Sequence, residues 1–291
     1  MTRVAVVANT KKFDQRGRRR LQDALQDGGL TPQEWITVPK GSAATKATKK
    51  ALDRGAEVVL VCGGDGTVRA ASEALIGTDA AIAVLPMGTA NAFAAAMDIP
   101  EDPAGVVELI RGGERRRIDT GTCNGMTFNL MAGAGFDAAL IDSADDDKDR
   151  LGMVAYVRSG VQQAREREAF EMRVDIDGDR VFTGPASCVL VANIGTLKGG
   201  IEAFPDSSPT DGVLDVAVVT ATGLKAWAGL VVSAVRGRQH LTGHARMWTG
   251  QTVCVRTDAK HRFELDGGVK GKAKRLEFGI APQSLTVCVP R

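Results

Sequence analysis

The chain has 291 residues, of which 44% are hydrophobic and 25% charged, and its net charge is +2. This length suffices for two hydrophobic cores, and the composition is that of a globular protein that folds in water. Aromatic residues make up only 4%, and no basic stretch is interleaved with them, so no nucleic-acid partner is expected. The cysteines stand singly in apolar segments, and neither a signal peptide nor a membrane-spanning stretch is recognisable. We therefore expect a cytoplasmic protein with free thiols.

Residues 1–119 alternate between strand and helix patterns. Strands are predicted at 4–9, 35–39, 57–63 and 80–86, and helices at 16–27, 44–54, 68–76, 90–99 and 103–111. The strands are apolar throughout, which is typical of a parallel sheet covered by helices on both faces. The pattern predicts an α/β nucleotide-binding domain with a mainly parallel sheet over residues 1–119.

After Asp119 the pattern changes to short strands separated by turns rich in Gly, Asp and Pro. The predicted strands lie at 126–136, 170–184, 186–195, 213–221, 252–258, 262–268, 276–280 and 284–290, and two helices are predicted at 151–168 and 224–236. This pattern favours an antiparallel sheet or sandwich. We predict a β-rich domain over residues 120–291, with a cleft between the domains and a last strand that could return to the first.

The segment CGGDGTV, Cys62 to Val68, joins a predicted strand to a predicted helix. Its glycines, Gly63, Gly64 and Gly66, let the backbone approach a ligand closely, and the N–H groups of a helix start favour phosphate. The segment lacks the lysine of a Walker loop and does not match the dinucleotide-binding glycine pattern. Asp65 could hold Mg²⁺ or accept a proton from an attacking hydroxyl; the alternative is a glycine turn with an aspartate helix cap.

A second strand, small-residue turn and helix follow about twenty residues later, in VLPMGTANAFAAAM, Val84 to Met97. Neighbouring strands of a parallel sheet end at the same edge, where ligands bind in open α/β folds. Thr89 and Asn91 could donate hydrogen bonds to the same phosphates as the first turn. Two such turns at this spacing favour a polyphosphate site.

The segments GGDGT (63–67) and LPMGTANAFA (85–94) together resemble the diacylglycerol kinase catalytic domain, the superfamily of diacylglycerol, sphingosine and related bacterial lipid kinases. The resemblance covers essentially the whole chain, through RIDTGTCNGMTFNLMAGAGFDAAL, LGMVAY, FPDSSPTDGVLDV, LDGG and LTVCVP. It implies ATP as donor, Mg²⁺, and phosphorylation of a lipid hydroxyl. It also implies an α/β domain like that of NAD kinase and a β-sandwich second domain.

Site residues follow from the resemblance. The ATP-binding residues that it implies are Asn9, Thr37, Gly63, Gly64, Gly66, Thr67, Gly88, Thr89 and Asn91. Asp65 would be central to metal or base chemistry. Asp211 would belong to a structural Mg²⁺ site with the backbone carbonyls of Ser208 and Val213, although the residues alone favour an Asp-Gly hairpin turn there.

Two departures from the family pattern bear on activity. The early N-P-x-S-G turn is represented by Asn9-Thr10-Lys11-Lys12, which changes how the donor is held, and the D-G-E glutamate, a proposed general base in bacterial relatives, is Gly268. Asp65 and Asp266 remain as carboxylates for that role, and phosphoryl transfer depends mostly on positioning and charge neutralisation. We expect an active lipid kinase. The alternatives are a catalytically weakened nucleotide- or lipid-binding paralogue and an NAD kinase-like enzyme.

Basic runs at 16–20, 111–117 and 270–275 have two interpretations, solvated faces or attraction to an anionic membrane. A kinase that acts on a bilayer lipid would benefit from the second, so peripheral membrane contact with a lipid substrate is expected. The sequence does not identify the lipid. It leaves the oligomeric state open as well, although a sheet edge of the second domain could pair two subunits.

Overall fold

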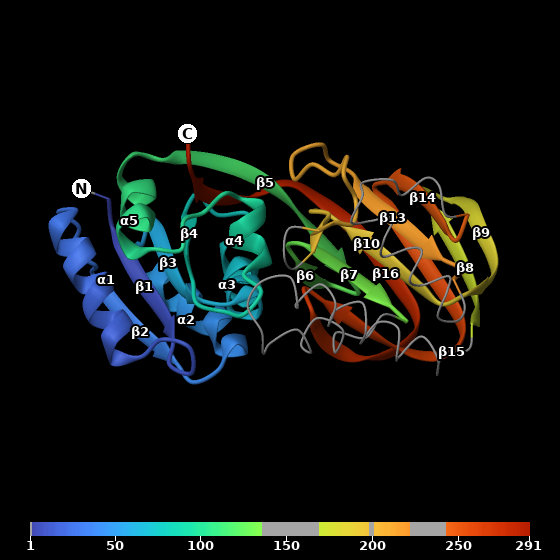
Figure 1. The fold of residues 1–291 in the computed structure, drawn as a ribbon, viewed down its shortest axis with the longest axis horizontal. Coiled ribbons are helices and arrows are strands. Elements are labelled where there is room, and N and C mark those ends of the chain that lie inside the picture. The colour runs from blue at the N-terminus through green and yellow to red at the C-terminus, as the bar shows by residue number, and fades with distance from the viewer. Residues whose placement is uncertain (1, 136–168, 198–200, 222–242) are drawn as a thin grey trace. The chain divides into compact units, whose positions relative to one another are not determined.

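The computed structural model describes residues 2–135, 169–197, 201–221 and 243–291 (Figure 1). The helices predicted at 151–168 and 224–236 therefore lie outside the described residues. The chain divides into two compact units, Met1–Thr120 with Pro282–Arg291, and Gly121–Ala281.

The first unit is built on a parallel sheet. Its strands are β1 (Val4–Asn9), β2 (Glu34–Val38), β3 (Val58–Gly63), β4 (Ala81–Pro86) and the end of β16 (Gly268–Val289), in the order β2-β1-β3-β4-β16. Every residue of β1, β3 and β4 is buried. Their continuous apolar sequences are explained by helices that cover both faces of the sheet.

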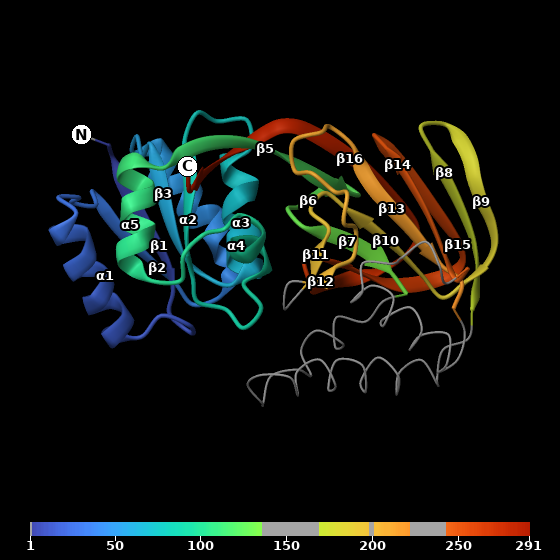
Figure 2. The ribbon, with the colours of Figure 1, turned by 45° about the horizontal axis from the view of Figure 1, so that its top comes forward.

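The helices of this unit are α1 (Gln15–Asp27), α2 (Ala44–Asp53), α3 (Asp65–Leu75), α4 (Ala92–Ala96) and α5 (Pro103–Gly112), with a 3₁₀ turn at Gly41–Ala43. α1 packs against α5 (Figure 2), and α2 packs against α3. α4 is shorter than the helix predicted at 90–99. It ends early because Asp98 takes the left-handed conformation, with φ +53°, which terminates the helix.

The order of the strands reverses between β1 and β3. From β1 the chain crosses to β2 on one side and then returns to β3 on the other. Open α/β sheets bind their ligands outside the carboxyl ends of the strands at such a reversal. The loops that follow β1 and β3 meet at this point.

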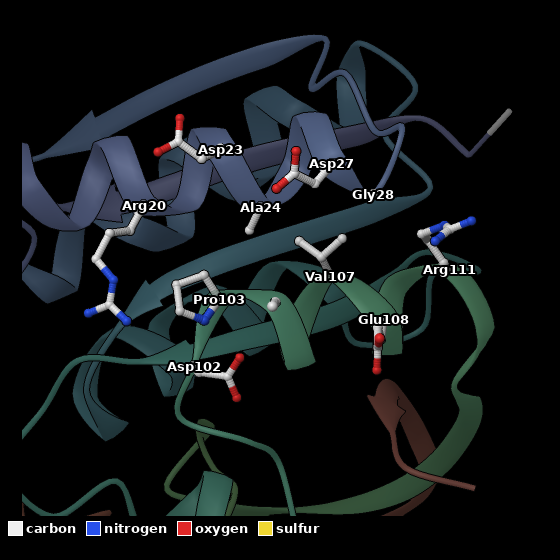
Figure 3. Close-up of a pocket in the computed structure, with 11 residues that line it drawn as sticks. Arg20, Asp23, Ala24, Asp27, Gly28, Asp102, Pro103, Val107, Glu108 and Arg111 are labelled. Carbon is white, nitrogen blue, oxygen red and sulfur yellow. The ribbon is translucent and has the colours of Figure 1, made fainter.

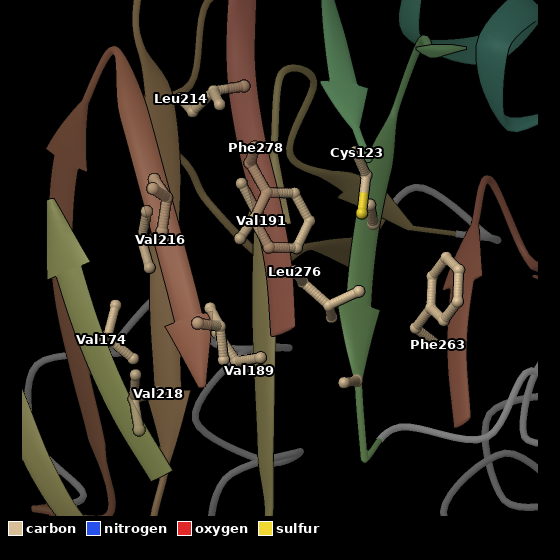
Figure 4. Close-up of a cluster of buried hydrophobic side chains, with 14 of the residues drawn as sticks. Cys123, Val174, Val189, Val191, Leu214, Val216, Val218, Phe263, Leu276 and Phe278 are labelled. Carbon is tan, nitrogen blue, oxygen red and sulfur yellow. The ribbon is translucent and has the colours of Figure 1, made fainter. Parts of the chain in front are cut away.

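The second unit consists of antiparallel strands. Those that the structure describes are β6 (Met126–Phe128), β7 (Met131–Ala134), β8 (Phe170–Ile176), β9 (Asp179–Ala186), β10 (Cys188–Ala192), β11 (Thr196–Leu197), β12 (Ile201–Glu202), β13 (Leu214–Val219), β14 (Ala245–Gly250) and β15 (Thr252–Leu265). β5 (Glu114–Cys123) and β16 contribute residues to both units. Inward-facing side chains such as Val174, Val216 and Leu276 form the hydrophobic core of this unit (Figure 4).

The fold class predicted from the sequence is confirmed: an α/β domain with a parallel sheet and a β-sandwich domain. The separation of the predicted strands 252–258 and 262–268 is wrong, because 252–258 and 262–265 belong to one strand, β15, and 266–268 form the turn to β16 and its first residue. The register of β15 against β16 shifts between Arg256 and His261, so the polar residues there form a bulge without ending the strand. The segments 276–280 and 284–290 likewise belong to one strand, β16.

Candidate active site

The first glycine loop (Gly63–Thr67) and the second glycine loop (Gly88–Asn91) are in direct backbone contact. A Cβ atom on Gly64 would lie 2.8 Å from the Cα of Gly88, so glycine is required by the packing of one loop on the other. The Gly88 N–H donates a hydrogen bond of 2.7 Å to Oδ1 of Asn91, which has φ +50°. The two loops therefore form a single rigid element at the carboxyl ends of β3 and β4.

Asp65 joins the two loops through its carboxylate. Oδ1 accepts a hydrogen bond from the Phe93 N–H at 2.9 Å, and Oδ2 accepts one from the Ala92 N–H at 3.2 Å. The first residue of α3 thus caps the start of α4, whose own N-cap, Asn91, makes no side-chain capping bond. Each carboxylate oxygen has two lone pairs, so one on each remains for a metal ion.

The loop after β1 reaches the same place through Asn9. Its Nδ2 donates to Oγ1 of Thr67 at 3.1 Å, and its Oδ1 accepts from the Lys11 N–H at 3.2 Å. A Cβ on Gly41, in the turn after β2, would lie 3.0 Å from the same Thr67 Oγ1. The loops after β1, β2 and β3 therefore converge on Thr67, which is buried.

Gly66 is the exception among the glycines of the first loop. A Cβ on Gly63 would lie 2.6 Å from that of Thr67, whereas a Cβ on Gly66 would meet nothing within 4 Å. Gly66 lies in the first turn of α3 and has no positive φ. Glycine within a helix is less stable than alanine by roughly 0.5–1 kcal/mol, so neither packing nor backbone conformation explains it. The absence of a side chain at Gly66 leaves open space beside the start of α3, which has no side-chain capping bond.

An uncapped helix start beside open space fits a phosphate group.

Two further predicted residues belong to this edge of the first unit. Thr37, in register with Ala8 of β1, and Thr89, in the second glycine loop, are both exposed. The structure therefore brings all the predicted ATP-binding residues to the carboxyl ends of β1 to β4.

Both parts of the chain match family models. Residues 3–123 match the diacylglycerol kinase catalytic domain, and residues 131–289 match the YegS C-terminal NAD kinase beta sandwich-like domain. The chain belongs to the diacylglycerol kinase catalytic-domain family.

Several known proteins are similar to this chain over most of its length. The diacylglycerol kinase of Bacillus subtilis is 29% identical over 278 residues, which are 93% of this chain and 91% of that protein. A Synechocystis protein, sll0036, is 32% identical over 251 residues, which are 84% of this chain but only 58% of that longer protein. The crystal structure of a diacylglycerol kinase from Bacillus anthracis matches this structure with a TM-score of 0.74 at 20% sequence identity. The match covers 99% of this chain and 96% of that chain, so the two proteins share a fold.

The second predicted catalytic carboxylate, Asp266, lies in the other unit, in the turn between β15 and β16. Its carboxylate accepts hydrogen bonds from the N–H groups of Asn129, Leu130 and Met131 at 2.9, 2.8 and 3.1 Å, and its own N–H donates to the Met131 carbonyl. These bonds hold the connection between β6 and β7. Asp266 therefore has a structural role. A catalytic role for Asp266 stays a prediction. Gly268, in the position of the family glutamate, begins β16.

The predicted structural metal site lies around Asp211. Its Oδ1 accepts a hydrogen bond of 3.1 Å from the Val213 N–H, the bond of an Asx turn. The hairpin-turn interpretation is wrong, because the strand before this turn, β12, pairs with β11, whereas β13 pairs with β10 and β14. Burial, together with the negative charges of Asp211 and Asp206, raises the pKa of Asp215 to about 6. The described residues contain no group of three or more His, Cys, Asp or Glu side chains that could hold a metal ion, so the structural Mg²⁺ site stays a prediction.

A groove of about 450 Å³ lies between α1 and α5 (Figure 3). Its floor is apolar, with Ala24, Pro103 and Val107, and charged side chains line its rim. None of the predicted site residues lines this groove. The edge where the glycine loops lock together remains the better candidate, because several loops converge there on one open helix start.

Proposed function

We propose that this protein is an ATP- and Mg²⁺-dependent lipid kinase that phosphorylates a hydroxyl of diacylglycerol or a related lipid. The observation that carries the proposal is the pair of glycine loops packed together at the carboxyl ends of β3 and β4, next to the reversal of the strand order, with open space over Gly66. Membership of the diacylglycerol kinase family and the name of the Bacillus subtilis relative support the reaction class and a lipid acceptor.

In this proposal the chain contributes mainly position and charge. Backbone N–H groups at the start of α3 and in the second glycine loop bind the donor phosphates. The lipid hydroxyl oxygen forms a bond to the γ-phosphorus, the bond from that phosphorus to the bridging oxygen breaks, ADP leaves, and the hydroxyl proton passes to water. Asp65 would hold Mg²⁺ with the lone pairs that its two capping bonds leave free. The metal, when bound, supplies charge neutralisation.

The basic runs differ in what the structure leaves them free to do. In 111–117, Arg115 donates to the carbonyls of Leu109 and Ile110 at the end of α5, and the two following arginines pair with carboxylates. In 16–20 only Arg18 has a close described partner, the ring of Trp35 at 5.3 Å.

We therefore assign membrane attraction to the start of α1, where each basic residue near an anionic surface contributes about 1 kcal/mol. No helix in the part of the chain that the structure describes is long and apolar enough to cross a bilayer.

A panel assay tests the function. Diacylglycerol, monoacylglycerol, sphingosine, ceramide, undecaprenol and NAD are each incubated with labelled ATP, Mg²⁺ and the protein. We expect the label to move to a chloroform-soluble product. Label on NAD would instead favour the NAD kinase-like alternative, and tight ATP binding without any product would favour the weakened paralogue.

Asp65→Asn tests the role of the carboxylate. The amide keeps one acceptor oxygen for α4, so the loss of stability should be about 1 kcal/mol, while phosphoryl transfer should be abolished. The matched control is Asp102→Asn, because Asp102 caps α5 through the Gly105 N–H at 2.9 Å and lies away from the glycine loops. Retained activity in Asp65→Asn, or equal losses in both variants, would refute the role.

A further inference from the structure

The outer face of α1 carries a stripe of four charged side chains, Arg16, Arg20, Asp23 and Asp27. Their spacings of four, three and four residues place them on one side of an α-helix, and the buried leucines of α1 lie on the other side. All four are exposed, and within the described ranges none of their side chains forms an ion pair or a hydrogen bond. Figure 3 shows three of them along α1, beside the groove that α1 forms with α5.

The order of these charges is unfavourable within α1 itself. Both arginines lie in the first half of the helix and both aspartates in the second, whereas the helix dipole favours acidic residues at the start and basic residues at the end. Arg16 and Arg20 are four residues apart, as are Asp23 and Asp27, and like charges at this spacing repel each other. The stripe therefore destabilises the isolated helix, and a contact with opposite charges from outside would offset this cost.

A second copy of α1 in antiparallel orientation presents those opposite charges. If a two-fold axis passes between residues 21 and 22, Arg16 faces Asp27 of the partner subunit and Arg20 faces Asp23 of the partner subunit. The symmetry repeats both pairs, so each of the four charges meets an opposite one. Complementarity of this kind determines the partner and the register of a contact more than its affinity.

The size of the contact sets its strength. A helix of 13 residues is only about 20 Å long, which is short for a permanent interface. Arg20, Asp23 and Asp27 also line the groove between α1 and α5, so a helix packed along the stripe lies against part of the apolar floor of that groove. We therefore expect a weak dimer whose population depends on protein concentration and on salt.

We propose that the charged stripe of α1 is a two-fold contact between two copies of this chain. The inference does not depend on the proposed function. It places the contact on the first unit, whereas the sequence suggested a sheet edge of the second domain. Arg18 and Arg19 lie outside the stripe, so the membrane attraction assigned to the start of α1 remains available to them.

Reversal of the charges tests the pairing. Arg16→Glu with Arg20→Glu makes the stripe wholly acidic, Asp23→Arg with Asp27→Arg makes it wholly basic, and the fourfold variant exchanges the two halves. Sedimentation velocity at low and high salt follows the mass of each protein with concentration, starting from the 30.6 kDa of the monomer. An equimolar mixture of the two double variants is measured in the same way.

Lys46→Glu with Lys49→Glu is the matched control. It changes the net charge by the same amount as the wholly acidic variant, and both lysines are exposed on α2 with no ion pair described for them. Circular dichroism checks that each variant is folded.

We expect the wild type to dimerise more strongly at low salt than at high salt. Each double variant should dimerise roughly 10- to 100-fold more weakly, because four attractive pairs become repulsive. The mixture and the fourfold variant should regain the affinity of the wild type, since every charge again meets its opposite. The control should dimerise like the wild type.

Three results would overturn the inference. One is a wild type that stays monomeric at every concentration, including the case in which the wholly acidic variant loses binding to vesicles of phosphatidylglycerol, because the stripe then serves the bilayer. The second is a dimer that both double variants form as well as the wild type, because the subunits then meet elsewhere. The third is a mixture that associates no better than its components. None of these results affects the kinase proposal, which the panel assay decides.

Discussion

Replacing Gly66 by alanine separates a functional glycine from a structural one. The added methyl group meets nothing within 4 Å in the first turn of α3, so the fold can accept it without movement. The same methyl group would occupy the space over the helix start where we place a phosphate. The substitution is therefore expected to change stability and binding in opposite directions.

The two magnitudes follow from these contacts. Alanine is more favourable than glycine in a helix by roughly 0.5–1 kcal/mol, which corresponds to a rise in Tm of about 1–4 °C for a chain of this size. Loss of one charge-assisted hydrogen bond from a backbone N–H to a phosphate costs about 1.5–3 kcal/mol, or roughly 10- to 150-fold in the dissociation constant of ATP.

Thermal unfolding and ATP calorimetry on the purified protein measure the two effects. The control is Gly64→Ala, whose Cβ would lie 2.8 Å from the Cα of Gly88 and should lower Tm because backbone must move. If Gly66→Ala binds ATP as the wild type does, no phosphate approaches this helix start. If its Tm falls as far as that of Gly64→Ala, the space over Gly66 is not open.

Two further substitutions test the electrostatics of the fold. The pKa of Asp215, raised to about 6, means that the folded state disfavours the ionised side chain, so its contribution to stability is present below pH 4 and lost as the pH rises to about 6. Asp215→Asn should therefore raise the free energy of unfolding at pH 7.5 by about 1 kcal/mol, after allowance for the partial exposure of Asp215, and with it Tm. At pH 4 both should stay unchanged, and equal shifts at the two pH values would contradict this. Arg115→Met should lower stability by about 1 kcal/mol, because the Ile110 carbonyl loses the hydrogen bond from Arg115, whereas the Leu109 carbonyl keeps the one from the Gly113 N–H. Urea unfolding measures the loss, and a variant as stable as the wild type would show that water replaces the lost bond fully.

Structure is predicted best from the sequence where one physical pattern dominates. Strands β1, β3 and β4 are apolar at nearly every position. In the first glycine loop, close packing requires glycine at two positions. The role of a side chain is predicted poorly from the sequence where its hydrogen-bond partner is distant along the chain. The bonds from the Ala92 and Phe93 N–H groups to Asp65 join residues 27 and 28 positions apart, and those to Asp266 join residues more than 130 apart.

Strand boundaries in the second unit show the same limit. β5 begins with the charged residues Glu114 to Arg117, which carry no apolar alternation, and was not recognisable as a strand. The bulge in β15 places turn-forming residues inside a continuous strand, since the pairing with β16 resumes beyond it. Pairing with a neighbouring strand decided these boundaries, and the local sequence did not.

The pairing of Thr286 and Val287 with Ala81 and Ile82 has a consequence for biosynthesis. The parallel sheet of the first unit takes its fifth strand from a segment that leaves the ribosome some two hundred residues after β4. Until the end of β16 has been synthesised, the edge of β4 that pairs with it lacks a partner strand. A nascent or truncated chain therefore exposes an unpaired, apolar strand edge. Fragments that stop near residue 120 should therefore aggregate unless the terminal segment is supplied in trans.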